Sequence, residues 1–272
     1  MKPLFSVYKE KEHIIFKIFS LKLSFKHKSK IAAIMCVRNE EYHLPTFLKH
    51  IQPYVDFIVA VDDGSTDKTY EILKSHPLCK KIVKLPPHDS EDWNEADNRK
   101  MVIDLAKKSR ADWVLCCDPD ERFELKFLKN IRKIISNDEK QSCYHLHFRE
   151  CWGKYDTYRA DGIWNKKEKG ILFPLTDKMD FDHHQNHHIP WYPHEISSHI
   201  SLNYNIYHLK MIKAEEREKR KNLYNTIDPN CLMQKIGYDY LTEEKGIKLV
   251  KIPDKKVYDM ELLPEDLKAY AE

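Results

Sequence analysis

Glycine is scarce in this chain, with 6 residues among 272. No GxxxxGK[ST] motif is present, which excludes a P-loop that cradles nucleotide phosphates. The 7 cysteines are odd in number and form no CxxC pair. Since most of them lie inside apolar runs, we expect reduced thiols that act as small hydrophobic side chains.

Long apolar runs are also absent. No stretch approaches the roughly 18 to 20 consecutive apolar residues of a membrane-spanning helix, and the N-terminus lacks the features of a secretory signal. The charges nearly balance, with 46 basic and 43 acidic residues, so composition does not indicate a nucleic-acid partner. We therefore expect a cytoplasmic protein that binds no nucleic acid.

From residue 31 onward, short apolar runs alternate with segments of helical period. Strands are predicted at 31–37, 57–61, 81–85, 112–117 and 143–148, with helices in the segments between them. Thr66 or Asp67 is the expected N-cap of the second helix, and Asp92 with Glu95 has the spacing of a capping box for the third. This alternation predicts an α/β fold, with a mostly parallel sheet covered by helices on both faces.

Two acidic clusters follow predicted strands. Asp62 and Asp63 end one apolar run, and Asp118 and Asp120 end another. Ligands bind at the carboxyl ends of strands in such sheets, and neighbouring strands would bring both clusters to one crevice. Two carboxylates flanking Pro119 suit a hard divalent cation, Mg²⁺ or Mn²⁺, whose other ligands include substrate phosphates. The alternative for Asp118 and Asp120 is a simple helix-capping turn.

The chain resembles a known family along these segments. The resembling motifs are VRNEE (37–41), VDDGSTDKT (61–69), DNRKMVIDLA (97–106), ADWVLCCDPDE (111–121), PHE (193–195) and YHLK (207–210). Together they resemble the family 2 glycosyltransferases of GT-A fold (Rossmann-like), in the branch that serves lipopolysaccharide, O-antigen and capsule synthesis. The resemblance implies sugar transfer from a nucleotide-sugar, with UDP as the expected carrier, to a glycan or lipid-linked acceptor.

The resemblance also implies roles for single residues on the nucleotide side. Asp62 and Asp63 would contact the base and ribose. Arg38 and Asn39 would lie at the neighbouring strand end, and Arg99 would reach the base or the pyrophosphate.

On the metal side, the resemblance implies that Asp118 and Asp120 are the DxD pair that holds Mn²⁺ or Mg²⁺, with Asp118 also touching the donor. His208 would complete this metal site; the alternative is an ordinary buried or surface histidine. Glu121 is expected to lie behind the metal ligands without binding the ion, or to act as a carboxylate at the N-terminus of the following helix.

Inverting transfer requires a carboxylate that deprotonates the acceptor hydroxyl. Glu195, in the PHE motif, is the first candidate for this catalytic base. Asp161 and Asp180 are the reserves.

Outside this core, the alternation in LKLSFK predicts a strand within an N-terminal β-ribbon at 1–30, with 31–210 as the GT-A domain and 211–272 as a helical appendage. The lysines of residues 1–30 leave a second reading open, in which this segment touches the anionic inner face of a membrane.

Three other functions compete with glycosyl transfer. A nucleotidyltransferase acting on a sugar phosphate uses a similar sheet, although VRNEE lacks the glycines of its usual loop. A zinc hydrolase is suggested by the histidines of 182–199, but His194, Glu195 and His199 form HExxxH, one residue longer than HExxH. The third alternative is a binding module without catalysis.

Overall fold

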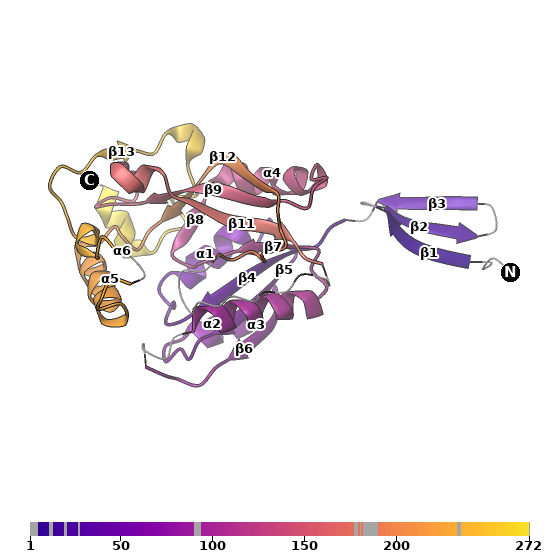
Figure 1. Ribbon diagram of the computed structural model, residues 1–272, viewed down its shortest axis with the longest axis horizontal. Coiled ribbons are helices and arrows are strands. Elements are labelled where there is room, and N and C mark those ends of the chain that lie inside the picture. Colours follow the sequence, from indigo (N-terminus) through magenta and orange to yellow (C-terminus); the bar gives the residue numbers. More distant parts are fainter. Residues whose placement is uncertain are drawn as a thin grey trace.

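A computed structural model gives the fold (Figure 1) and describes residues 5–10, 13–18, 21–26, 28–89, 94–176, 179, 181, 190–232 and 235–271. Its centre is an eight-stranded sheet of order β6-β5-β4-β7-β11-β9-β12-β8. The strands are β4 (Ile31–Val37), β5 (Phe57–Asp62), β6 (Cys79–Lys84), β7 (Trp113–Cys116), β8 (Glu121–Phe123), β9 (Cys143–Glu150), β11 (Glu168–Pro174) and β12 (His199–His208).

The first half of the sheet is parallel and follows the sequence prediction. β4 pairs in parallel with β5 and with β7, and β5 pairs in parallel with β6. Every residue of β5 and all but one of β4 are buried, as expected for apolar strands covered on both faces. All five predicted strands are present, with boundaries that differ by at most a few residues.

The second half of the sheet mixes directions. β11 is antiparallel to both β7 and β9, β9 and β12 are parallel, and β8 closes the edge antiparallel to β12. The strands β8, β11 and β12 were not predicted from the sequence. Parallel pairs remain the majority in the sheet, so the predicted α/β class with a mostly parallel sheet is confirmed.

Helices lie around the sheet (Figure 1). They are α1 (Leu44–Ile51), α2 (Thr69–Ser75), α3 (Glu95–Lys108), α4 (Leu125–Ser136), α5 (Ala214–Ile227) and α6 (Glu265–Lys268). α3 packs against β4 and β5, whereas α4 packs against β12. The amphipathic spacing of α4 explains this, because its apolar stripe is the face that is buried.

Two predicted helix caps need correction. Lys68 is the N-cap of α2, and Asp67 instead accepts a hydrogen bond from Thr69 N at 2.9 Å. α3 is capped by Asn94, whose side chain accepts from Asp97 N at 3.1 Å; Asp92, the predicted cap, lies outside the described residues.

Smaller elements flank the main sheet. β1 (Phe5–Glu10), β2 (His13–Ile18) and β3 (Leu21–Lys26) form an antiparallel sheet, and β3 is the predicted LKLSFK strand. β10 (Thr157–Arg159) pairs with β13 (Leu249–Lys251). The C-terminal segment packs through two apolar clusters onto side chains between Cys151 and Trp164. This packing ties the predicted appendage closely to the domain before it.

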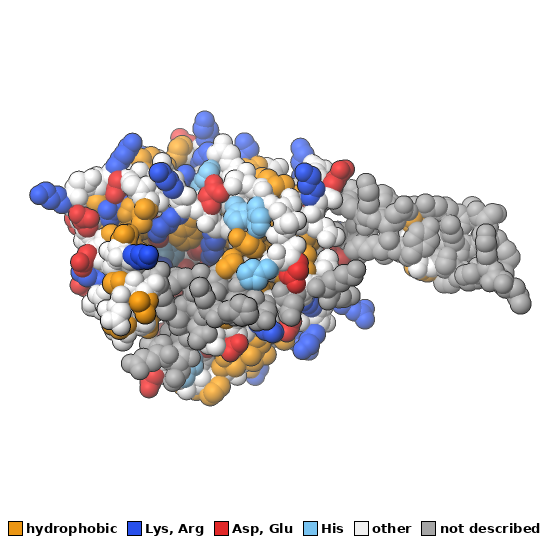
Figure 2. Space-filling model, in the orientation of Figure 1, with side chains coloured by type: hydrophobic (Ala, Val, Ile, Leu, Met, Phe, Trp, Pro, Cys, Tyr) orange, Lys and Arg blue, Asp and Glu red, His pale blue; other side chains and the backbone are white. Residues whose placement is uncertain are grey.

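On the face drawn in Figure 2, acidic and basic side chains are interspersed over the main body. Within the described ranges, no helix is both long enough and apolar enough to cross a membrane.

Candidate active site

A cavity of about 820 Å³ opens at the carboxyl ends of β4, β5 and β7. Its lining comes from the loops after these strands, from α3, from β9, β11 and β12, and from one face of α5. It includes Arg38, Asn39, Asp63, Glu95, Arg99, Asp118, Asp120, Lys169, Trp191, His208 and Lys210. Most of the residues predicted for the donor and the metal thus surround one space.

Parallel pairing explains why both acidic clusters arrive here. β5 and β7 lie on either side of β4, and their chain directions agree, so Asp63 and Asp118 leave the sheet at the same edge. The prediction placed the two acidic clusters on neighbouring strands, but β4 lies between β5 and β7. The cavity therefore spans three strand ends.

Asp62 has a different place from Asp63. Its Oδ1 accepts a hydrogen bond from Ser65 N at 2.7 Å, and it is not among the residues that line the cavity. Gly64 makes this turn possible, because its φ is +73° and a Cβ there would lie 2.6 Å from Pro86 O. Asp62 thus shapes the loop that presents Asp63.

His88 joins the two loops on the nucleotide side. Its Nε2 is 2.9 Å from Asp63 Oδ1, and Arg38 donates a hydrogen bond to its carbonyl. The hydrogen bond to Asp63 is the main cause that raises the pKa of His88. Asn39, at a φ of +53°, accepts from Thr66 N at 2.9 Å. Sequence reasoning missed His88, since no motif marks it.

Arg99 reaches the cavity from α3. Its guanidinium carbon lies 4.4 Å from the centre of the Trp191 ring, and its side chain forms an ion pair with Glu95 one helical turn earlier. These contacts hold a cationic, planar group in the cavity wall, where it can pair with a phosphate or stack on a base.

Asp118 and Glu121 share a lysine. Lys169 Nζ, from β11, lies 2.5 Å from Asp118 Oδ2 and 2.6 Å from Glu121 Oε1. Burial raises the pKa of Glu121 to about 7, although the charge of Lys169 opposes the shift. The repulsion among the acids after β7 is therefore offset by Lys169, a cation that no sequence motif marks.

Asp120 belongs to a second group with His208 and Glu150. His208 Nε2 is 3.1 Å from Asp120 Oδ2, and His208 Nδ1 is hydrogen-bonded to Glu150. Burial alone would lower the pKa of His208, but the carboxylates of Glu150 and Asp120 outweigh it and raise the pKa to about 9. Lys210 adds a charge 3.7 Å from Asp120.

A buried arginine fixes the loop that carries these acids. Arg122 Nη1 donates to the carbonyls of Pro119 at 2.9 Å and Glu121 at 2.7 Å, and its Nη2 donates to Thr46 on α1 at 2.7 Å. With the backbone held from behind, the carboxylates of Asp118 and Asp120 face the cavity.

The donor atoms here suit a hard divalent cation. The hydrogen bond between His208 Nδ1 and Glu150 orients the imidazole ring so that Nε2 faces Asp120. Metal-ligating histidines usually have one ring nitrogen bonded to a carboxylate in this way. Within the described part of the chain, however, Asp118, Asp120 and His208 do not bring three donor atoms within 4.8 Å of one another. Asp118 contacts Lys169 instead, so a cation shared by both aspartates would compete with that lysine.

The sequence pattern of the family described as "Glycosyl transferase family 2" matches residues 32–232, most of the chain. The chain belongs to glycosyl transferase family 2. The matched region contains every residue that the resemblance assigned to donor and metal. This finding supports the predicted family and GT-A fold; it does not extend to the lipopolysaccharide and capsule branch.

Two curated relatives match part of the chain. Uncharacterized proteins of Mycobacterium bovis and Mycobacterium tuberculosis are each 32% identical over 97 residues, which is 34% of this chain and 23% of theirs. The chain thus spans about a quarter of the length of these curated relatives.

Solved structures with some similarity include glucosyl-3-phosphoglycerate synthase from Mycobacterium tuberculosis in complex with Mn²⁺, UDP-glucose and phosphoglyceric acid. It is 17% identical, with 44% of each chain covered and a TM-score of 0.35. A structure described as a mycobacterial protein is also 17% identical, over 45% of this chain and 42% of that chain, with a TM-score of 0.34.

Two of the three predicted base candidates of this family 2 member, Glu195 and Asp161, are not among the residues that line the cavity. Glu195 is exposed and is not among the lining residues. Asp161 accepts hydrogen bonds from Arg159 Nε at 3.0 Å and from Lys248 N at 3.0 Å, and it too is not in the lining. Asp180 lies outside the described residues.

The cavity contains another carboxyl group that sequence reasoning did not consider. Glu40, in the VRNEE motif, lies 3.4 Å from Lys210 Nζ. Burial raises its pKa to about 7, opposed by the charge of Lys210. A carboxyl group with a pKa near neutrality is suited to accept and return a proton.

Basic groups line the side of the cavity next to α5. They are Lys167, Lys169, Lys210, Lys219 and Arg220, and Tyr224 and Leu223 lie among them. Acidic side chains pair with all four of these lysines, so the wall carries charges of both signs.

Proposed function

We propose that this family 2 member catalyses metal-dependent, inverting transfer of a sugar from a nucleotide-sugar, with UDP as the carrier. The observation that carries the proposal is the convergence of Asp63, Arg99, Asp118 and Asp120 on one cavity at the strand ends. Family membership supplies the reaction class. The choice of UDP rests on the motif resemblance.

In this proposal, the nucleotide lies against the loops after β4 and β5. Asp63 and Arg38, both tied to His88, offer hydrogen bonds to base and ribose. Arg99 then faces the pyrophosphate. Leaving-group departure builds negative charge on the nucleoside diphosphate, and a fixed cation nearby lowers the cost of that charge.

Mn²⁺ or Mg²⁺ would be held by Asp118, Asp120 and His208. When bound, the ion neutralises the diphosphate and favours its departure. Glu150 keeps the His208 ring in place, while Lys169 holds the charge of Asp118 and Glu121 when no ion competes for them.

The acceptor is proposed to be a glycan or a lipid-linked sugar of cell-surface polysaccharide synthesis. This narrower assignment rests on the resemblance of the motifs. The basic and aromatic groups that α5 adds to the cavity are compatible with a lipid-linked phosphate. The same proposal includes contact of residues 1–30 with the inner face of the membrane. Cosedimentation with anionic vesicles tests this contact: deletion of residues 1–30 should reduce it, and no loss would contradict the contact.

Donor screening tests the reaction class, the carrier and the metal together. The full chain is incubated with a panel of nucleotide-sugars, with Mn²⁺ or with EDTA, and released nucleotide is measured. We expect hydrolysis of a UDP-sugar that requires the ion. Release from no donor, or equal release in EDTA, would contradict the proposal.

The catalytic base is tested by a matched pair of substitutions. Glu195→Gln and Glu40→Gln each remove one acidic group while keeping similar volume. The variant that lacks the catalytic base should bind UDP and Mn²⁺ as the unmodified chain does, but it should lose sugar transfer. Glu195 is proposed from the resemblance, and Glu40 is the candidate that the cavity supports. Full activity in both variants would eliminate both.

A further inference from the structure

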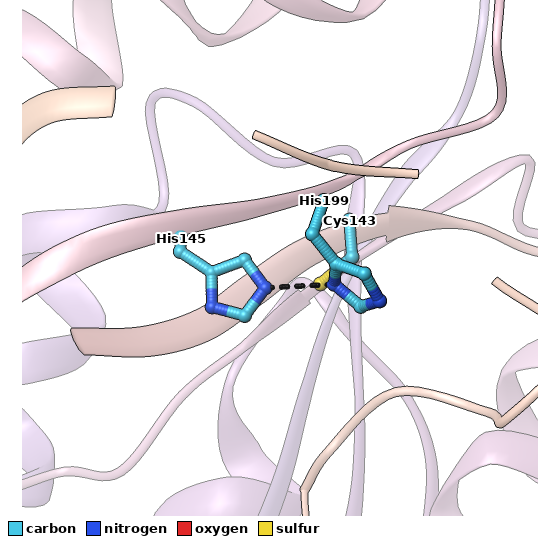
Figure 3. A group of neighbouring side chains, drawn as sticks. All are labelled: Cys143, His145 and His199. Carbon is cyan, nitrogen blue, oxygen red and sulfur yellow. Dashed lines mark hydrogen bonds between the residues drawn. The ribbon is translucent and has the colours of Figure 1, made fainter. Parts of the chain in front are cut away.

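Cys143, His145 and His199 form a cluster outside the cavity (Figure 3). One ligand atom from each residue lies within 4.8 Å of those of the other two. His145 Nε2 and His199 Nδ1 are 3.0 Å apart and joined by a hydrogen bond. Among the described residues, no other group of three or more Cys, His, Asp or Glu side chains has such spacing.

The strand geometry explains the cluster. Cys143 and His145 are two residues apart on β9 and therefore point to the same face of the sheet. β12 runs parallel to β9, with His199 in register with Cys143. Three ligand-bearing side chains thus come from two hydrogen-bonded strands, which are among the more rigid elements of a fold.

We propose that Cys143, His145 and His199 bind a zinc ion at the amino ends of β9 and β12, with water in the fourth position. Thiolate sulfur and imidazole nitrogen are the ligands that Zn²⁺ prefers. Zn–N bonds of about 2.0–2.1 Å place two nitrogen ligands of a tetrahedral site roughly 3.3 Å apart, close to the spacing of the two imidazoles. The ion replaces the proton that they share.

Neighbouring residues pack closely around the two imidazole rings. Gly170, opposite His145 on β11, is buried, and a Cβ there would lie 2.8 Å from His145 Cε1. Tyr192 packs edge-on against both imidazoles, at 5.5 Å from His145 and 4.9 Å from His199 between ring centres. Glycine on one side and an aromatic ring on the other leave little freedom to His145.

The three ligands differ in exposure to solvent. Cys143 is buried, His145 is partly buried and His199 is exposed, so an ion can enter from the solvent side. When an ion binds, Cys143 coordinates it as the thiolate, and the thiol proton leaves to solvent.

This site is separate from the cavity. None of the three ligands lines the cavity, and Phe148, the β9 residue that does, is five residues from Cys143, a span of roughly 16 Å along the strand. The zinc ion would join β9 and β12 where neither is held by the active-site groups. We assign it a structural role, which does not depend on the proposed reaction.

Cobalt spectroscopy provides the test. Co²⁺ is titrated into the metal-free full chain, and the near-ultraviolet band of a thiolate–Co²⁺ bond is followed, with Zn²⁺ then added to displace the ion. We expect one equivalent of Co²⁺ with this band and its loss on adding Zn²⁺. Histidines elsewhere in the chain cannot produce a thiolate band.

Three variants test which residues bind the ion. Cys143→Ala should abolish the band, and His199→Ala, at an exposed position that tolerates substitution, should weaken Co²⁺ binding at least tenfold. Asp118→Asn/Asp120→Asn should leave the band intact. The proposal is overturned by an absent band in the unmodified chain, or by unchanged binding in His199→Ala. If Cys143→Ala does not fold, His145→Ala replaces it under the same criterion.

Discussion

The two ends of β9 and β12 carry contrasting chemistry. At the carboxyl ends, Glu150 and His208 join Asp120 in a buried group of charged side chains. At the amino ends, Cys143, His145 and His199 form a cluster of sulfur and nitrogen donors that opens to solvent. The same pair of parallel strands thus presents oxygen-rich donors at one end and sulfur and nitrogen donors at the other.

This difference shows how surroundings decide the state of a histidine. Two carboxylates outweigh the effect of burial at His208 and raise its pKa, whereas burial, together with the neighbouring His199, lowers the pKa of His145. A hard ion suits the first end and a borderline ion the second. The comparison predicts that each end can be disabled without the other.

The largest expected effect follows from Asp118→Asn/Asp120→Asn. Loss of the charge that holds the metal should reduce sugar transfer on the order of 10²–10³-fold or more. His199→Ala, the matched change at the opposite end, should retain normal transfer. Initial rates with a UDP-sugar at saturating Mn²⁺ measure both. An equal loss in His199→Ala would show that the two ends are not independent.

Glu150→Gln should have a smaller effect at the same end. The amide can still accept a hydrogen bond from His208 Nδ1, but it no longer balances the imidazolium. We expect Mn²⁺ affinity in the presence of UDP to fall by roughly 10- to 100-fold. Calorimetry measures this fall. Zn²⁺ affinity at the amino ends should stay constant, and a parallel drop there would instead indicate general loosening of β9.

Stability in EDTA should depend on pH in opposite directions at the two ends. The pKa of His208 is about 9 in the folded chain, against about 6.5 unfolded. Protonated His208 therefore contributes roughly 3 kcal/mol to the free energy of unfolding. This contribution is fully present below pH 6.5 and is lost as the pH rises through 9. The pKa of His145 is lowered, so its contribution is present above pH 6.5 and is lost on acidification.

Urea unfolding from pH 5 to pH 10 separates these contributions. His208→Gln should flatten the stability profile on the alkaline side, and His145→Gln should flatten it on the acidic side. The two variants serve as controls for each other. Identical profiles for both would contradict the assigned directions.

Asp161→Asn should have the smallest effect. This side chain orders Arg159 and the backbone at Lys248, outside the cavity wall. We expect unchanged transfer and a loss of less than about 1 kcal/mol in the free energy of unfolding, because the pair lies partly in solvent. A large loss of transfer would restore Asp161 as a base candidate.

Much of the parallel half of the sheet was predictable because its signals are local. The runs at 31–37 and 57–61 are apolar throughout, and a strand buried on both faces needs that pattern. Their acidic ends then follow from the parallel direction of the strands. The helix caps were less predictable, since Asn94 and Asp67 each compete with nearby polar residues for the same backbone groups.

The missed groups come from segments with weaker local signals. Lys169 lies on β11, which inserts antiparallel between β7 and β9. His88 follows β6 in a loop without a motif, and Glu150 ends a strand whose partner, β12, was not predicted. None of these neighbours can be inferred without the strand order.

The sequence alone determined the fold class, the family and the strand end at which Asp118 and Asp120 lie, because hydrophobic period and motif spacing are properties of nearby residues. The tertiary structure decided which groups meet those acids, and it brought His199 beside Cys143 and His145. These contacts join residues about 50 or more positions apart. They depend on strand order and register, which arise from the packing of the whole sheet and leave no local trace in the chain.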